Sequence, residues 1–132
     1  MIKGLDHVAI AVNRIDDALQ IFEHTLGLKL EGVKNVEQQK VKIAMLRAGA
    51  DKIELLESTS PESSVAKFLA TRGEGIHHIA VEVSDIEGCL RELKEKGIAL
   101  IDEKPRPGAE AKKIAFVNPR GTKGVLLELV EH

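Results

Sequence analysis

The sequence contains no tryptophan, no tyrosine and only three phenylalanines. Side chains on which nucleic-acid bases could stack are therefore scarce. Its 19 lysines and arginines and 21 aspartates and glutamates give a net charge of −2, and the basic residues form no block. Nucleic-acid binding usually requires such a basic patch, so we expect no nucleic-acid partner.

Cysteine is scarce as well: Cys89 is the single instance, which excludes a disulfide within the chain. It lies in the middle of an expected helix beside Ile86 and Leu90, where a packed thiol is expected rather than a nucleophile. No apolar run approaches the roughly 20 residues that cross a bilayer. Residues 1–6 also lack the zones of a signal peptide, so we expect a cytoplasmic protein that does not enter a membrane.

What the chain does contain is an internal repeat with an offset of 71 residues. The repeated strand-like segments are HVAIAV at 7–12 and HIAVEV at 78–83, KIAML at 42–46 and KIAFV at 113–117. Each copy is followed by a segment with a central glutamate, IELL at 53–56 and LELV at 127–130. Self-similarity of this kind indicates two similar structural modules.

The periodicity of apolar residues predicts the same order of elements in both halves: strand, helix and three strands. The expected elements are 6–12, 13–26, 28–34, 40–48 and 51–57, then 77–83, 84–96, 98–102, 112–117 and 124–130. In the linker between the halves, Ser60 is expected to cap a helix with Pro61 in its first turn. A capping box is expected at 84–87, and Gly27 and Gly97 are expected to end the two module helices.

The predicted fold class is therefore α+β, with two βαβββ modules in one domain. Module one covers residues 1–57, the linker helix 58–75 and module two 76–132, within a single domain of residues 1–132. A content of 43% apolar residues is ordinary for a folded domain of this length.

Each module carries one histidine and one glutamate at related positions of apolar strands: His7 and Glu54, then His78 and Glu128. A single strand histidine is more often a packed residue than a ligand, but a buried carboxylate needs a partner or a metal. Two imidazole nitrogens and two carboxylate oxygens leave two positions open on an octahedral metal. The repeat therefore predicts a divalent metal site made of these four residues. By strand alternation, His77 points away from its neighbour His78.

Several motifs carry a resemblance that spans nearly the whole chain: DHVAIAV at 6–12, SVAKFL at 64–69, GEGIHHIA at 73–80, DEKPRPG at 102–108 and GVLLEL at 124–129. On these motifs the chain resembles the vicinal oxygen chelate superfamily (glyoxalase, bleomycin resistance, dioxygenase). Within it, the chain is most similar to the methylmalonyl-CoA epimerases. The resemblance implies one glyoxalase-like domain, and it places the family's metal ligands on His7, Glu54, His78 and Glu128.

The resemblance further implies an isomerase that inverts the α-carbon of methylmalonyl-CoA by proton abstraction through a metal-stabilised enolate. Cobalt is the first choice of metal, with nickel, manganese or zinc as alternatives. Glu128 is expected to be one catalytic base and Glu54 the second. A basic loop that includes Lys104, Arg106 and Lys112 is expected to meet the anionic groups of the acyl-CoA, and the resemblance suggests a homodimer.

Three positions depart from the family pattern. Ile43 stands where bacterial epimerases have one of two glutamates proposed as the acid/base pair, Asn118 where histidine is usual, and Ala111 where glycine is common. Since isoleucine transfers no proton, the first departure leaves the second catalytic base open.

Three other functions are compatible with the same fold. A glyoxalase I-type lactoylglutathione lyase uses a His, Glu, His, Glu metal sphere, which Glu54 favours. An extradiol dioxygenase is disfavoured, because a fourth ligand would occupy an open position of its iron site. A metal-free module that binds a small molecule is also disfavoured, because such sites are usually lined with aromatic side chains.

Overall fold

The computed structural model describes all residues from 1 to 132 and confirms the α+β fold class. The strands are β1 (Ile2–Ala11), β2 (Lys29–Val36), β3 (Val41–Ala48), β4 (Asp51–Ser58), β5 (Gly75–Val83), β6 (Lys113–Val117) and β7 (Leu127–Glu131). The helices are α1 (Ile15–Leu19), η1 (Gln20–Thr25), α2 (Ser64–Arg72), α3 (Ile86–Glu95) and η2 (Pro119–Gly121). None of these helices is both long enough and apolar enough to cross a membrane.

The chain divides into two compact units, and two strands run from one unit into the other. The N-terminal unit comprises His7–His77, and the C-terminal unit comprises Met1–Asp6 together with His78–His132. Strand β1 passes between the units at the Asp6–His7 bond, and β5 does so at the His77–His78 bond.

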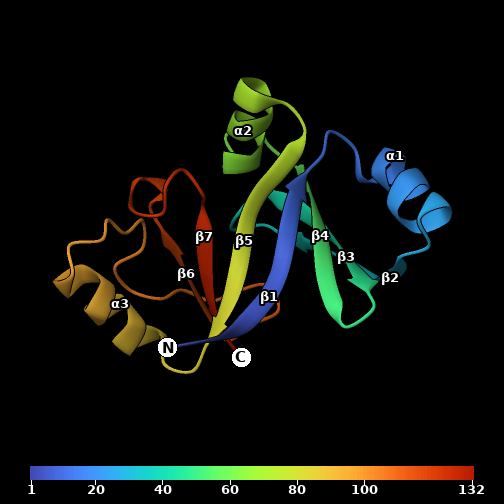
Figure 1. Cartoon of the computed structure of the whole chain (residues 1–132). Helices are drawn as coiled ribbons and strands as arrows, with labels where there is room; N and C mark the ends of the chain where they lie inside the picture. The colour runs from blue at the N-terminus through green and yellow to red at the C-terminus, as the bar shows by residue number, and fades with distance from the viewer. The chain divides into compact units, whose positions relative to one another are not determined.

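In the N-terminal unit the strand order is β2-β3-β4-β1, with β1 parallel to β4 and the other neighbours antiparallel (Figure 1). On one face Leu55 is buried in a cluster with Ile15 of α1. Because alternate residues of a strand point to opposite faces, Glu54 points to the other face. Ala9 pairs with Glu54 and shares that face, and so does His7, two residues earlier on β1.

The C-terminal unit repeats three of these four strands in the order β5-β7-β6, with β5 parallel to β7 and β6 antiparallel to it (Figure 1). Leu129 packs with Leu90 of α3 in a buried cluster on one face. Glu128 consequently points to the opposite face. Ala80 pairs with Glu128, so His78, two residues before Ala80, lies on the same face as Glu128.

The helix predicted over residues 13–26 is shorter and less regular than expected. It consists of α1 followed by the π-helix η1, where the backbone N–H of Leu26 donates to the carbonyl of Ile21 at 2.8 Å, five residues back. Its predicted end at Gly27 is confirmed, because Gly27 has a φ of 80°, a conformation that favours glycine.

Both predicted helix caps are displaced. Helix α2 is capped by Ser63 rather than Ser60, because the Ser63 hydroxyl accepts the backbone N–H of Ala66 at 3.0 Å. Helix α3 is capped by Asp85, whose carboxylate accepts the backbone N–H of Gly88 at 3.1 Å. In each case a better-placed acceptor than the predicted one lies further along the chain.

The strand predicted over residues 98–102 is wrong. Only Leu100 makes a β-bridge, to Val117. The backbone N–H groups of Ile101 and Asp102 both donate to the carbonyl of Phe116, each at 3.1 Å, so no regular ladder continues. The last strand also starts later than predicted, at Leu127.

Candidate metal centre

In the N-terminal unit, neighbouring strands bring His7 and Glu54 together. Their side chains come from β1 and β4 and are only 8% and 13% exposed. Nε2 of His7 lies 3.5 Å from Oε1 of Glu54. The unit therefore presents one imidazole nitrogen and one carboxylate oxygen on a shared face.

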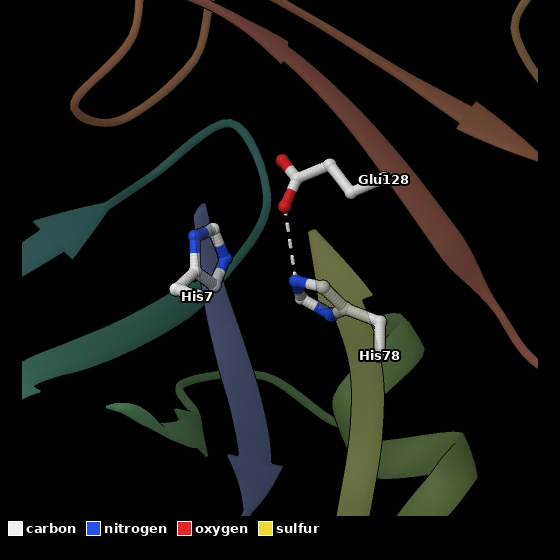
Figure 2. A group of neighbouring side chains, drawn as sticks. All are labelled: His7, His78 and Glu128. Atoms are coloured by element: carbon white, nitrogen blue, oxygen red, sulfur yellow. Dashed lines mark ion pairs between the residues drawn. The ribbon is translucent and has the colours of Figure 1, made fainter. Parts of the chain in front are cut away.

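The C-terminal unit contains the corresponding pair, His78 and Glu128, on β5 and β7. Nε2 of His78 lies 3.0 Å from Oε1 of Glu128, as the dashed line in Figure 2 marks, and the two side chains are 7% and 8% exposed. The ring of Phe116 meets the His78 ring edge to face, with centroids 5.4 Å apart and planes at 90°. Phe116 pairs with Glu128 across β6 and β7, which puts both side chains on one face.

Three of the four predicted metal ligands form one group. One ligand atom each of His7, His78 and Glu128 lies within 4.8 Å of the other two (Figure 2). Glu54 is not part of this group of three but approaches His7. The role of Glu54 as a fourth metal ligand stays a prediction.

Burial separates these three residues from the other polar side chains. The structure has four buried polar or charged residues, namely His7, Ser63, His78 and Glu128. Ser63 has a structural role as the cap of α2. The other three combine two imidazoles with one carboxylate, a donor set that suits cobalt, nickel, manganese or zinc. The residues present therefore fit a divalent ion.

The basic residues predicted to contact substrate lie in the irregular segment between α3 and β6. Lys104, Arg106 and Lys112 are all exposed at its surface. Arg106 contacts a neighbour of the histidine–glutamate pair of the C-terminal unit, because its Cζ lies 5.4 Å from the centroid of the Phe116 ring.

The three departures from the family pattern have defined places in the structure. Ile43 is buried on β3, where it pairs with Leu56. Asn118 caps η2, since its side-chain oxygen accepts the backbone N–H of Arg120 at 3.0 Å. Ala111 packs beside the buried Ile114. Ile43 and Ala111 can neither transfer a proton nor bind a metal, and the side-chain oxygen of Asn118 is used by the cap.

The sequence prediction did not include Phe116 or Asp102 among the residues of the site. Asp102 accepts the backbone N–H of Phe116 at 2.9 Å. The repeat carried a signal for Phe116, because it occupies the position equivalent to Met45, which pairs with Glu54.

Comparisons with known proteins point to one superfamily. The sequence model of the glyoxalase/bleomycin resistance protein/dioxygenase superfamily matches residues 6–116. Among solved structures, hypothetical protein BH1468 from Bacillus halodurans superposes with a TM-score of 0.94 at 49% identity, over 97% of this chain and 93% of that chain.

Two further solved structures are methylmalonyl-CoA epimerases. The enzyme from Mycobacterium tuberculosis matches with a TM-score of 0.91 at 38% identity, over 98% of this chain and 88% of that chain. An epimerase in complex with methylmalonyl-CoA and NH4+ matches with a TM-score of 0.92 at 33% identity, over 99% of this chain and 95% of that chain.

Proposed function

Because the chain belongs to the glyoxalase/bleomycin resistance protein/dioxygenase superfamily, we propose that it is a metal-dependent epimerase that inverts the α-carbon of methylmalonyl-CoA. The observation that carries the proposal is the buried group of His7, His78 and Glu128. It occurs in a chain that matches a methylmalonyl-CoA-bound epimerase over almost its whole length.

His7, His78 and Glu128 would hold the ion, with Glu54 as the fourth donor. A divalent ion bound there would act as a Lewis acid toward the negative charge that develops when the α-proton leaves a thioester. Inversion also requires one group to remove the proton on one side of the carbon and another to return it on the other side.

Glu128 and Glu54 are the proposed proton-transfer groups. Both carboxylates lie on the ligand-bearing faces of their units, on β7 and β4. Glu54 lies outside the group formed by His7, His78 and Glu128, which supports a role for its carboxylate in proton transfer. Ile43 cannot contribute, since its side chain has no ionisable group.

Lys104, Arg106 and Lys112 remain our proposed contacts to the anionic groups of the acyl-CoA, supported by their exposure and positive charge. Cobalt as the physiological metal, the two-module boundaries, a homodimer and a cytoplasmic location stay predictions.

The experiment that tests the function is α-proton exchange. Metal-loaded protein and a chelator-stripped sample are incubated with methylmalonyl-CoA in deuterated water, and the α-position is followed by NMR. We expect deuterium wash-in that depends on the metal. No exchange despite a stoichiometric metal would favour the lactoylglutathione lyase, assayed with the glutathione hemithioacetal of methylglyoxal. No exchange and no bound metal would leave a binding module.

The two carboxylates are distinguished by Glu54→Gln. If Glu54 transfers the proton on one side of the α-carbon, Glu128 should still exchange the α-proton of one substrate isomer for deuterium in Glu54→Gln. The inverted isomer should not accumulate. Glu128→Gln should lower exchange of both isomers by about 10²–10⁴-fold, because it removes a base and a metal ligand together. Chiral analysis of the product and metal content are measured for each variant.

The matched control is Ile43→Val, which keeps an apolar side chain at the family's glutamate position and should change neither exchange nor inversion. Unchanged inversion in Glu54→Gln would remove Glu54 from the catalytic pair.

A further inference from the structure

A second set of side chains in the C-terminal unit ends at His78, and only one of its members, Arg106, already has a part in the proposed function, as a contact to the acyl-CoA. The first member is Phe116, whose ring lies edge to face against the His78 imidazole with centroids 5.4 Å apart. Phe116 is on β6, opposite Glu128 on β7. The aromatic ring therefore packs on the imidazole at the side of the unit that carries the proposed ligands.

The second member is Arg106, whose guanidinium lies over the Phe116 ring. Its Cζ is 5.4 Å from the centroid of the Phe116 ring, within the range of a cation–π interaction. Its Nε is 3.3 Å from Oδ2 of Asp102. The same Asp102 oxygen accepts the backbone N–H of Phe116 at 2.9 Å. The Asp102 carboxylate thus binds both the backbone of β6 at Phe116 and the Arg106 guanidinium that lies over the Phe116 ring.

The backbone around Arg106 is held against β6 as well. Arg106 and Ile114 exchange two backbone hydrogen bonds, of 2.9 and 2.8 Å. A Cβ at Gly108 would lie 2.6 Å from Cγ2 of Ile114, so only glycine permits the segment to approach this closely. Although the Arg106 side chain is 45% exposed, it contacts both Asp102 and the Phe116 ring, and its backbone is paired with Ile114.

We propose that Asp102, Arg106 and Phe116 are positioning residues that hold the His78 ring with its Nε2 toward Glu128. The proposal rests on the proposed function in so far as His78 is a metal ligand. A histidine ligand must present its nitrogen in one orientation, and the groups around it commonly change metal affinity by about 10–100-fold when they are removed. Here the Phe116 ring packs against the His78 imidazole and restricts its rotation. The Arg106 side chain, held by its ion pair with Asp102, in turn restricts the Phe116 ring.

The chain contains a matched control for this arrangement. In the N-terminal unit, Cζ of Arg72 lies 5.6 Å from the Phe68 ring centroid. The Phe68 ring in turn meets the ring of His77, with centroids 5.0 Å apart and planes at 67°. The two stacks have the same composition, but they end at neighbouring histidines that point to opposite faces of β5. Only the stack at His78 should affect the metal.

The experiment compares Arg106→Met with Arg72→Met in the whole protein. Co²⁺ affinity is measured from the visible absorption of the bound ion, and the ring nitrogens of His78 and His77 are followed by NMR in metal-free protein. We expect Arg106→Met to weaken Co²⁺ binding by about 10–100-fold and to shift or broaden the His78 ring signals. Arg72→Met should change the His77 signals and leave Co²⁺ affinity at the wild-type value.

Two further variants guard against loss of folding and against a charge effect. Phe116→Leu should reproduce Arg106→Met, and if it fails to fold the half-exposed Arg106 still carries the test. Arg106→Lys keeps the cation but lacks the planar group beside Asp102, so it should restore part of the Co²⁺ affinity.

The outcomes separate this proposal from the proposed function. Unchanged Co²⁺ affinity and unchanged His78 signals in Arg106→Met, with only a higher KM for the acyl-CoA, would overturn positioning and leave Arg106 with its substrate contact alone. If the wild type bound neither Co²⁺ nor Ni²⁺, Mn²⁺ or Zn²⁺, the proposed function would fail. The His78 signals of metal-free Arg106→Met would then still decide the positioning role, because a change supports it and no change overturns it.

Discussion

Equivalent residues of the two repeats are not chemically equivalent in this chain. The residue that pairs with Glu54 is Met45, and the residue that pairs with Glu128 is Phe116. An aromatic ring can pack edge to face on an imidazole, whereas a methionine side chain is flexible and restricts its neighbour less. We therefore expect the His78 ring to be held more firmly than the His7 ring.

Cys89 allows a direct test of burial at the scale of one residue. It is packed within the C-terminal cluster, as predicted, and burial raises the pKa of its thiol. Since the thiolate is the reactive form, native protein should react only slowly with a disulfide reagent near neutral pH. Reaction should become fast when denaturant is added. Rapid stoichiometric labelling of folded protein would contradict this placement.

At the scale of single elements, the corrected position of the α3 cap makes a prediction. Asp85→Ala should lower the free energy of unfolding by about 1 kcal/mol, because the N–H of Gly88 loses its acceptor. Ser84→Ala, one residue earlier, removes no cap and should leave stability nearly unchanged. Urea unfolding followed by circular dichroism measures both, and a larger loss in Ser84→Ala than in Asp85→Ala would favour the cap predicted from sequence.

Strands with alternating apolar residues were predictable because one face of the strands in each unit packs with a helix in a buried cluster. The segment at 98–102 was not, since its apolar pattern is that of a strand while its N–H groups share the carbonyl of Phe116. The choice between Ser84 and Asp85 as cap was equally out of reach, because both residue types cap helices well. The pattern of apolar residues therefore predicts which residues are buried better than it predicts which group accepts a given backbone hydrogen bond.

The same distinction applies to the candidate site. Histidines and glutamates at repeated positions of apolar strands are visible in the sequence, because charged residues are rare where a core is expected. The contacts of Arg106 with Phe116 and Asp102 are not visible there. They depend on how an irregular segment folds back on β6, which no periodicity encodes.

For the whole molecule, metal binding should raise the free energy of unfolding. Binding to the folded state alone at 100 times Kd adds about 2.7 kcal/mol, and for a chain of this size that raises Tm by roughly 10 °C. We expect such a rise with Co²⁺ in calorimetry and its reversal by chelator. His7→Ala and His78→Ala should each abolish the rise, although they alter different units. A rise that persists in both variants would place the ion elsewhere.

The discontinuous make-up of the C-terminal unit has a consequence for protein synthesis. Met1–Asp6 leaves the ribosome before the rest of its own unit, and the whole of His7–His77 follows before His78 does. Because chains fold while they are being translated, the N-terminal unit can form while these first residues still lack their neighbours. During that interval Ile2 and Leu5 belong to a segment that offers unpaired backbone groups to other nascent chains or to a chaperone. Although the start of β1 is synthesised first, the order of translation thus makes it the last part of that strand to fold.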